Sequence, residues 1–443
     1  MKKLILSVLA ASSLITLEAA PKYEGLRKAQ EVQAREGIGN VLKKIRAGEE
    51  IVVAYLGGSI TSMNGWRNMT TDWLKETYPN AKFKEIHAAI GGTGSGLGVF
   101  RVGWDALRHN PDLLFIEFAT NDSGAQPEAI WKNMEGIVRQ TWKKDPTTDI
   151  VFTYTITGSM KEEYLAGNCN RAASAMEMLA DHYGIPSINF GPRVAALLAQ
   201  NKLVMGAKDI ETAVPKQDPE YDRKVKELRK NDKRLLFAND SVHPRQEGHL
   251  LYRASITNGF TQMKDTWKKP SNHAAKLATP FIEGNMENAK MVDITPDMLT
   301  GLWEKLPETD RKMKSFSKRM GQIWSASKPG DTLKFKFKGT FCSIYDLLGP
   351  DGGQVWITVD GKKSKRVIPR FDSYCTYHRI SSLWVFSGKD GEHTVEITVD
   401  KDQPSRKSVA FRLKDPDKEL AEEKYQGTKF WASKIQLVGE LIK

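Results

Sequence analysis

Cysteine is scarce in this sequence, and the spacing of the few that occur excludes the common structural metal sites. The 443 residues include Cys169, Cys342 and Cys375, with no CxxC pair and no cysteine–histidine spacing typical of zinc ligands. A zinc finger or zinc ribbon is therefore excluded. Cys342 and Cys375 fall in strand-like stretches, where they either form a disulfide in an oxidising compartment or remain buried free thiols.

Long hydrophobic runs are also missing, apart from one at the N-terminus. Residues 4–11 are mostly apolar, follow a Met-Lys-Lys start and precede the small residues Ala19 and Ala20. The run is shorter than the ~20 residues that a membrane-spanning helix needs. This pattern favours a secretory signal peptide over residues 1–20 rather than an N-terminal membrane anchor. We therefore expect a secreted or periplasmic protein without stable membrane insertion.

Charge of one sign is in excess but is not concentrated anywhere. The chain has 66 lysines and arginines against 54 acidic residues, a formal net charge of +12 that is spread evenly along the sequence. It lacks a basic tract interleaved with aromatic residues and any helix-turn-helix spacing, so we expect no nucleic-acid partner. The excess positive charge then has two remaining interpretations. It either gives the protein an affinity for an acidic polysaccharide or is simply a solvated basic surface without a binding role.

In the first half of the chain, strand-like and helical stretches alternate as they do in an α/β protein. After a polar, helix-prone segment at 21–50, helical stretches separate five strand-like runs, at 51–56, 83–90, 113–119, 149–156 and 186–190. Near-continuous apolar strands alternating with helices indicate a parallel sheet that is covered on both faces. We therefore predict a flavodoxin-like doubly wound sheet in a domain that spans residues 21–275.

Two other regions depart from this alternation of strands and helices. Residues 206–236 are charged and contain two prolines, which indicates an insertion that forms either part of a substrate rim or a plain surface helix. Residues 276–443 change to alternating strands such as 333–338, 355–359 and 394–399. This period predicts an all-β sandwich or jelly-roll domain. Its polar and aromatic stretch at 370–379 is expected to face the active-site rim.

Polar residues follow several of the predicted strands, where open α/β sheets bind their ligands. Ser59 follows the first strand in the turn Gly57-Gly58-Ser59, Gly92 follows the second, and Asn121 follows the third. Asp240 and His243 lie near the end of the α/β pattern. A serine hydroxyl needs a neighbouring base to act as a nucleophile, and a histidine oriented by an aspartate supplies one.

These short blocks, in the order Ser, Gly, Asn and His, resemble the SGNH hydrolases, also called GDSL-type esterases. The resemblance covers residues 47–262 and implies a flavodoxin-like architecture. It also implies that Ser59, Asp240 and His243 form the catalytic triad, and that Ser59, Gly92 and Asn121 form the oxyanion hole. One position departs from the family pattern, because Gly58 stands where an aspartate usually precedes the serine.

The leading hypothesis is a secreted serine esterase that needs no metal or cofactor. It would hydrolyse O-acyl esters, most simply acetyl, on a polysaccharide or oligosaccharide. Export and the appended β-domain, which resembles the accessory domains of carbohydrate-active enzymes, favour an acylated glycan as substrate. One alternative is a lipid or aryl esterase of the same family, although the sequence has no evident apolar lid. The other is a glycan-binding protein with an inactive hydrolase fold.

Overall fold

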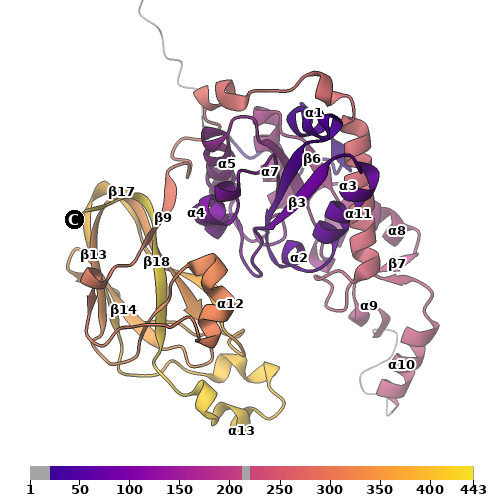
Figure 1. The fold of residues 1–443 in the computed structure, drawn as a ribbon. Coiled ribbons are helices and arrows are strands. Elements are labelled where there is room, and N and C mark those ends of the chain that lie inside the picture. Colours follow the sequence, from indigo (N-terminus) through magenta and orange to yellow (C-terminus); the bar gives the residue numbers. More distant parts are fainter. Residues whose placement is uncertain (1–19, 212–219, 443) are drawn as a thin grey trace, which may run out of the picture.

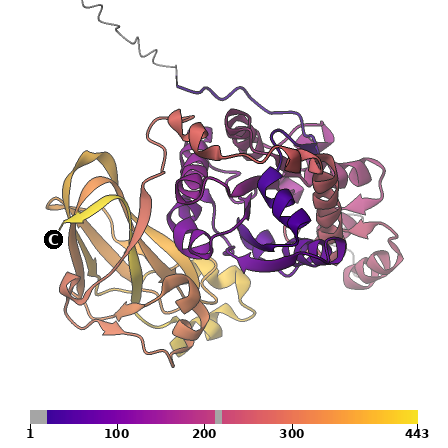
Figure 2. The same ribbon diagram turned by 45° about the horizontal axis from the view of Figure 1, so that its top comes forward.

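The structure, a computed structural model, describes residues 20–211 and 220–442. An α/β domain is followed by a domain of antiparallel strands, and the two lie side by side in both views (Figures 1 and 2). The signal peptide expected over residues 1–20 lies, except for Ala20, outside the described residues. No helix in the described part of the chain is long and apolar enough to cross a membrane.

The first domain is built on a six-stranded sheet with the order β1-β6-β5-β4-β2-β3. Its strands are β1 (Val32–Gln33), β2 (Glu50–Gly57), β3 (Lys82–His87), β4 (Leu113–Glu117), β5 (Asp149–Tyr154) and β6 (Ser187–Asn189). Strands β2 to β6 are parallel, and their order β3-β2-β4-β5-β6 is the predicted flavodoxin-like one. The short antiparallel edge strand β1 was not predicted, because two residues in a polar segment carry no periodic pattern.

Helices cover both faces of this sheet because its central strands are apolar on both sides. Leu114 and Ile116 of β4 face one core, while Leu113 and Phe115 face the other. The first face is covered by α4 (Ser95–Asp105), α5 (Pro127–Lys144) and α7 (Arg171–Tyr183). The second is covered by α1 (Gly39–Ala47), α3 (Trp66–Thr77), α8 (Gly191–Ala199) and α11 (Gln246–Met263). The short helix α2 (Ser59–Ser62) continues directly from β2.

The charged segment at 206–236 lies on one side of this domain, away from the second domain (Figure 1). It includes α9 (Ala207–Glu211) and α10 (Tyr221–Asn231), and the strands β7 (Leu203–Val204) and β8 (Leu235–Leu236) pair at its base. Residues 212–219 of the segment lie outside the described residues. Most described residues of α10 are exposed, as the surface-helix interpretation expects.

The second domain confirms the predicted all-β architecture, and its strands form one continuous ten-stranded sheet with antiparallel pairing. Its main strands are β9 (Ala289–Asp293), β12 (Trp324–Ala326), β13 (Thr332–Leu348), β14 (Gln354–Val359), β17 (Arg379–Val399) and β18 (Phe430–Ile442). The pairing of β13 shifts between Gly339 and Phe341, where glycines let the backbones approach closely. Side chains from both halves of these strands then meet in one core.

All three cysteines are buried and free, so the free-thiol alternative describes Cys342 and Cys375. Cys342 lies in the main core of the second domain, whereas Cys375 packs with Phe371 and Tyr425 in a separate small cluster. The two thiols therefore belong to different packing units, which leaves no cross-sheet pair to bridge.

The chain stays on the first domain beyond residue 275. The backbone N–H groups of Phe281 and Ile282 donate to the Glu135 carboxylate on α5, at 2.6 and 2.9 Å, and Glu287 pairs with Arg139. Only at Ala289 does the chain enter β9 of the second sheet. The segment joining the domains is thus fixed along α5 before the second domain begins.

Candidate active site

Ser59 is the first residue of α2 and lies at the carboxyl end of β2. The turn before it needs glycine at Gly58. A Cβ atom there would lie 1.9 Å from the Asn121 Oδ1 atom. Any larger residue at this position would therefore require the Asn121 side chain to shift. The same contact shows that Asn121 lies directly beside the serine turn.

His243 and Asp240 complete a hydrogen-bonded series with Ser59. The His243 Nε2 atom is 2.8 Å from Ser59 Oγ, and its Nδ1 atom is 2.7 Å from Asp240 Oδ2. Burial raises the pKa of Asp240, but hydrogen bonds from the His243 side chain and from two backbone N–H groups outweigh it and leave the pKa below its ordinary value. Asp240 is therefore ionised at neutral pH, and the 54% exposure of its side chain favours the same charged form.

The loop that carries both residues is held by its own backbone and by two glycines. The Asp240 Oδ1 atom accepts hydrogen bonds from the backbone N–H groups of Val242, at 3.0 Å, and of His243, at 2.8 Å. Ser241 between them has a left-handed φ of 64°. Its side chain fills the space where a Cβ on Gly158 or Gly206 would lie. These contacts fix the loop in the conformation that points His243 at Ser59.

The predicted glycine and asparagine follow β3 and β4, the two strands that flank β2 in the sheet. A Cβ on Gly91 would lie 3.7 Å from the Ser59 Cβ atom, so the β3–α4 loop passes close to the serine. Gly92 follows with a left-handed φ of 72° that favours glycine, and it has open space around it. The structure therefore brings all five predicted residues, Ser59, Gly92, Asn121, Asp240 and His243, to the carboxyl rim of the sheet.

Buried polar side chains that the sequence analysis missed support this rim. Asp122 accepts the Ser95 backbone N–H at 3.0 Å, and burial raises the pKa of its carboxyl to about 6 against the effect of these hydrogen bonds. Glu117 accepts hydrogen bonds from the Thr61 and Thr155 hydroxyls at 2.9 and 2.8 Å, and burial also raises its pKa. A charged residue at the end of the apolar run 113–116 was the available signal for Glu117.

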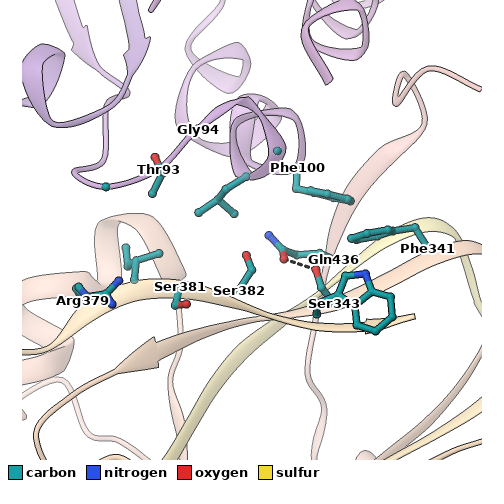
Figure 3. A pocket seen from close by; sticks show the side chains of 14 residues that line it. Thr93, Gly94, Phe100, Phe341, Ser343, Arg379, Ser381, Ser382 and Gln436 are labelled. Carbon is teal, nitrogen blue, oxygen red and sulfur yellow. Dashed lines mark hydrogen bonds between the residues drawn. The ribbon is translucent and has the colours of Figure 1, made fainter. Parts of the chain in front are cut away.

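A cleft of about 250 Å³ opens beside Gly92, between the two domains. In Figure 3, Thr93, Gly94 and Phe100 of the first domain face Ser343, Ser381, Ser382 and Gln436 of the second across it. Phe100 stacks on Phe341 with ring centroids 5.2 Å apart. The wall also includes Trp384, which is 61% exposed, and Arg379, the last residue of the stretch expected to face the rim. Hydroxyl, amide, guanidinium and aromatic groups therefore line the approach to Gly92.

No group of three or more histidine, cysteine or acidic side chains is placed to hold a metal ion within the described residues. The chemistry that the site offers is that of a serine, a histidine and a carboxylate in hydrogen-bond contact. An amide side chain and the backbone N–H groups of a glycine loop lie beside them.

Known proteins share this sequence pattern and this fold. Residues 55–251 match the model of the GDSL-like lipase/acylhydrolase family. A two-domain esterase active on acetylated mannans, co-crystallized with mannopentaose, is 20% identical with a TM-score of 0.65, covering 91% of this chain and 94% of that chain. A second structure of a two-domain esterase active on acetylated mannans is 19% identical with a TM-score of 0.64, covering 95% and 99% respectively.

At these identities the two structures establish a shared fold, which extends over both domains. No protein among those with curated descriptions matches the sequence. The family model covers the end of β2, α2, the β3–α4 loop, Asn121 and the Asp240–His243 loop, which are the segments that meet at the rim. Residues 55–251 of the chain are therefore similar to the GDSL-like lipase/acylhydrolase family.

Proposed function

We propose that this protein is a serine esterase that removes O-acyl groups, most simply acetyl, from a polysaccharide or oligosaccharide outside the cytoplasm. The observation that carries the proposal is the hydrogen-bonded series from Ser59 Oγ through His243 to Asp240, with distances of 2.8 and 2.7 Å. A serine hydroxyl in contact with an oriented imidazole is the arrangement that acyl transfer to serine requires.

In the proposed reaction, Ser59 Oγ attacks the ester carbonyl carbon while His243 Nε2 takes the hydroxyl proton. Asp240 holds the imidazole by its Nδ1–H and stabilises the imidazolium that forms. The oxyanion accepts hydrogen bonds from the backbone N–H groups of Ser59 and Gly92 and from the Asn121 amide. His243 then returns the proton to the leaving sugar hydroxyl, and water releases the acyl group from Ser59 by the same steps.

The cleft beside Gly92 supports a glycan substrate. Its wall combines an exposed indole, that of Trp384, with hydroxyls and an amide from the second domain. Aromatic faces pack on the apolar faces of sugar rings, while hydroxyl and amide groups bond to sugar hydroxyls. A substrate chain in this cleft would contact both domains while its ester lies at Ser59. The mannan esterases with the same two-domain fold act on acetylated glycans, and this is consistent with the proposal.

The test compares purified wild-type protein with Ser59→Ala on p-nitrophenyl acetate, acetylated glycans and long-chain esters. Ser62→Ala, on the same helix, is the matched control, since its hydroxyl has no part in the proposed reaction. We expect wild type and Ser62→Ala to release acetate from a glycan, and Ser59→Ala to release none above background. Preference for long-chain esters would favour a lipid esterase. Binding of glycans without hydrolysis of any ester would indicate an inactive glycan-binding protein.

A further inference from the structure

The outer edge of β3 has backbone carbonyl groups that the sheet does not satisfy. β3 is the last strand of its sheet, and β2 is its only strand neighbour among the described residues. Toward β2, the N–H groups of Ala88 and Ile90 donate to the carbonyl oxygens of Tyr55 and Gly57, each at 3.0 Å. The peptide groups of His87 and Ala89 alternate to the opposite side, where the described part of the chain places no strand. Ala89 is buried, so its carbonyl group needs a donor from elsewhere in the protein.

A side chain of the second domain supplies that donor. Arg319 lies on α12 (Arg311–Met320), and its Nη2 atom donates to the carbonyl oxygens of His87 and, at 3.2 Å, of Ala89. Its side chain is 20% exposed; the hydrogen bond to Ala89 is partly buried, whereas the one to His87 is exposed. The helix is seated on α4 by a second contact, from Trp104 Nε1 to the Lys318 carbonyl oxygen at 3.1 Å.

The same guanidinium group joins a buried charge network. The Arg319 Nη1 atom is 3.5 Å from Asp105 Oδ1, an oxygen with no hydrogen-bond partner in the described part of the chain. The other oxygen, Asp105 Oδ2, accepts from Arg101 at 2.9 Å. Arg101 also donates to the carbonyl oxygens of Ala88 and, at 3.0 Å, of Gly57. Two arginines therefore hold three successive carbonyl groups, 87 to 89, from opposite sides.

These three residues lead directly into the loop beside the serine. Gly91 and Gly92 follow Ala89 and Ile90, and Gly91 has the Ser59 Cβ atom as its neighbour. Gly57, the other carbonyl held by Arg101, lies two residues before Ser59. We propose that Arg319 of the second domain is a positioning residue for the reaction at Ser59, because it fixes the backbone from which Gly92 presents its N–H to the oxyanion.

This inference rests on the proposed function, and it assigns the second domain a role beyond binding a glycan. Arg319 does not line the cleft beside Gly92, so a substrate in that cleft is not its direct partner. Removing it should lower the turnover of any ester, including one too small to reach the second domain. A residue that only binds glycans would leave the turnover of a small ester unchanged.

The experiment compares Arg319→Met, Arg319→Lys and the control Lys314→Met, which removes the same charge from an exposed position on α12. Turnover of p-nitrophenyl acetate is measured well below each melting temperature, together with hydrogen exchange of the amides in residues 88–94. We expect Arg319→Met to lower kcat about tenfold with KM within about twofold, and to speed exchange in this segment. Arg319→Lys should recover part of both, since an ammonium group bonds carbonyls but does not also reach Asp105. Lys314→Met should match wild type.

Unchanged kcat or unchanged exchange in a folded Arg319→Met variant overturns the inference. So does an equal loss in Lys314→Met. A loss of kcat that vanishes on further cooling below the melting temperature also overturns it, because it would reflect unfolding alone. These outcomes differ from failure of the proposed function, in which the wild-type protein itself hydrolyses no ester and both proposals fall.

Discussion

At the scale of single residues, Gly58 shows how one absent side chain organises the site. The space that a Cβ would take at Gly58 is occupied by the Asn121 amide oxygen. The glycine at this position therefore leaves room for the side chain of another motif residue, 63 positions later. From the sequence, the order of the blocks predicted which residues meet, but this contact between two of them could not be read from either motif alone.

His243→Ala should reduce ester turnover by at least about 10³-fold, and Asp240→Asn should reduce it less. His243 exchanges a proton with Ser59 directly, whereas Asp240 acts through the imidazole, and its 54% exposed side chain leaves water able to replace part of its effect. Steady-state kinetics on p-nitrophenyl acetate measure both variants. A larger loss in Asp240→Asn than in His243→Ala would contradict these roles.

Asn121→Ala should lower kcat by about 10²–10³-fold with a modest change in KM, since an oxyanion donor acts mainly on the transition state. Asn121 is exposed, so truncating it should cost little stability. Kinetics and a melting curve on the same sample decide between this role and a merely structural one. Unchanged turnover in a folded variant, or a loss fully explained by unfolding, would remove Asn121 from the oxyanion hole.

At the scale of secondary-structure elements, the ends of the strands and helices determine the site more than their interiors. The period of apolar residues predicted β2 to β6, with helical stretches between them, because burial on two faces leaves a strong pattern. The same pattern does not predict the contacts of the residues that lie between these elements. Asp122 and Glu117, which hold the loops at these ends, act through contacts between residues 27 to 56 positions apart.

The N-terminus of α4 offers a prediction about pH. Asp122 accepts the Ser95 N–H there, and burial raises its pKa from an ordinary 3.8 to about 6. Between these two values the folded protein binds a proton that the unfolded chain does not. This group therefore makes the free energy of unfolding fall as pH rises from about 4 to about 6, by roughly 1.4 kcal/mol for each pKa unit of difference.

Asp122→Asn removes this titration while keeping an oxygen that accepts the Ser95 N–H. We expect its free energy of unfolding to fall less than that of wild type over the same pH interval. Urea unfolding at pH 4, 5, 6 and 7 measures both proteins. Parallel stability curves for the two proteins would mean that Asp122 has no raised pKa in the folded state.

At the scale of the whole molecule, the relation between the two domains is what the sequence predicted least. The alternation of apolar residues predicted an all-β second domain, but it did not predict two features of that domain. Its strands form one continuous sheet. Its helix α12 reaches the first domain, where Arg319 meets residues 230 or more positions earlier. Such contacts depend on how two folded units meet, and no local period records that.

The interdomain cleft makes a prediction about substrate size. Trp384→Ala should raise KM for an acetylated oligosaccharide about three- to tenfold while leaving p-nitrophenyl acetate kinetics unchanged, since an aromatic contact is worth roughly 0.5–1.5 kcal/mol. Phe411→Ala is the matched control. Phe411 is 73% exposed on the same domain but does not line the cleft. The comparison therefore separates the position of an aromatic ring from its mere exposure.

Varying the length of the glycan gives a further test of the role of Trp384. A monosaccharide ester fills less of the cleft than an oligosaccharide, so the effect of Trp384→Ala should grow with chain length until the added sugars lie beyond the indole. Kinetics on acetylated mono-, di- and tetrasaccharides measure this dependence. An equal effect at every length would place the indole beside the acylated sugar itself. No effect at any length, or the same effect in Phe411→Ala, would show that the second domain binds substrate elsewhere or not at all.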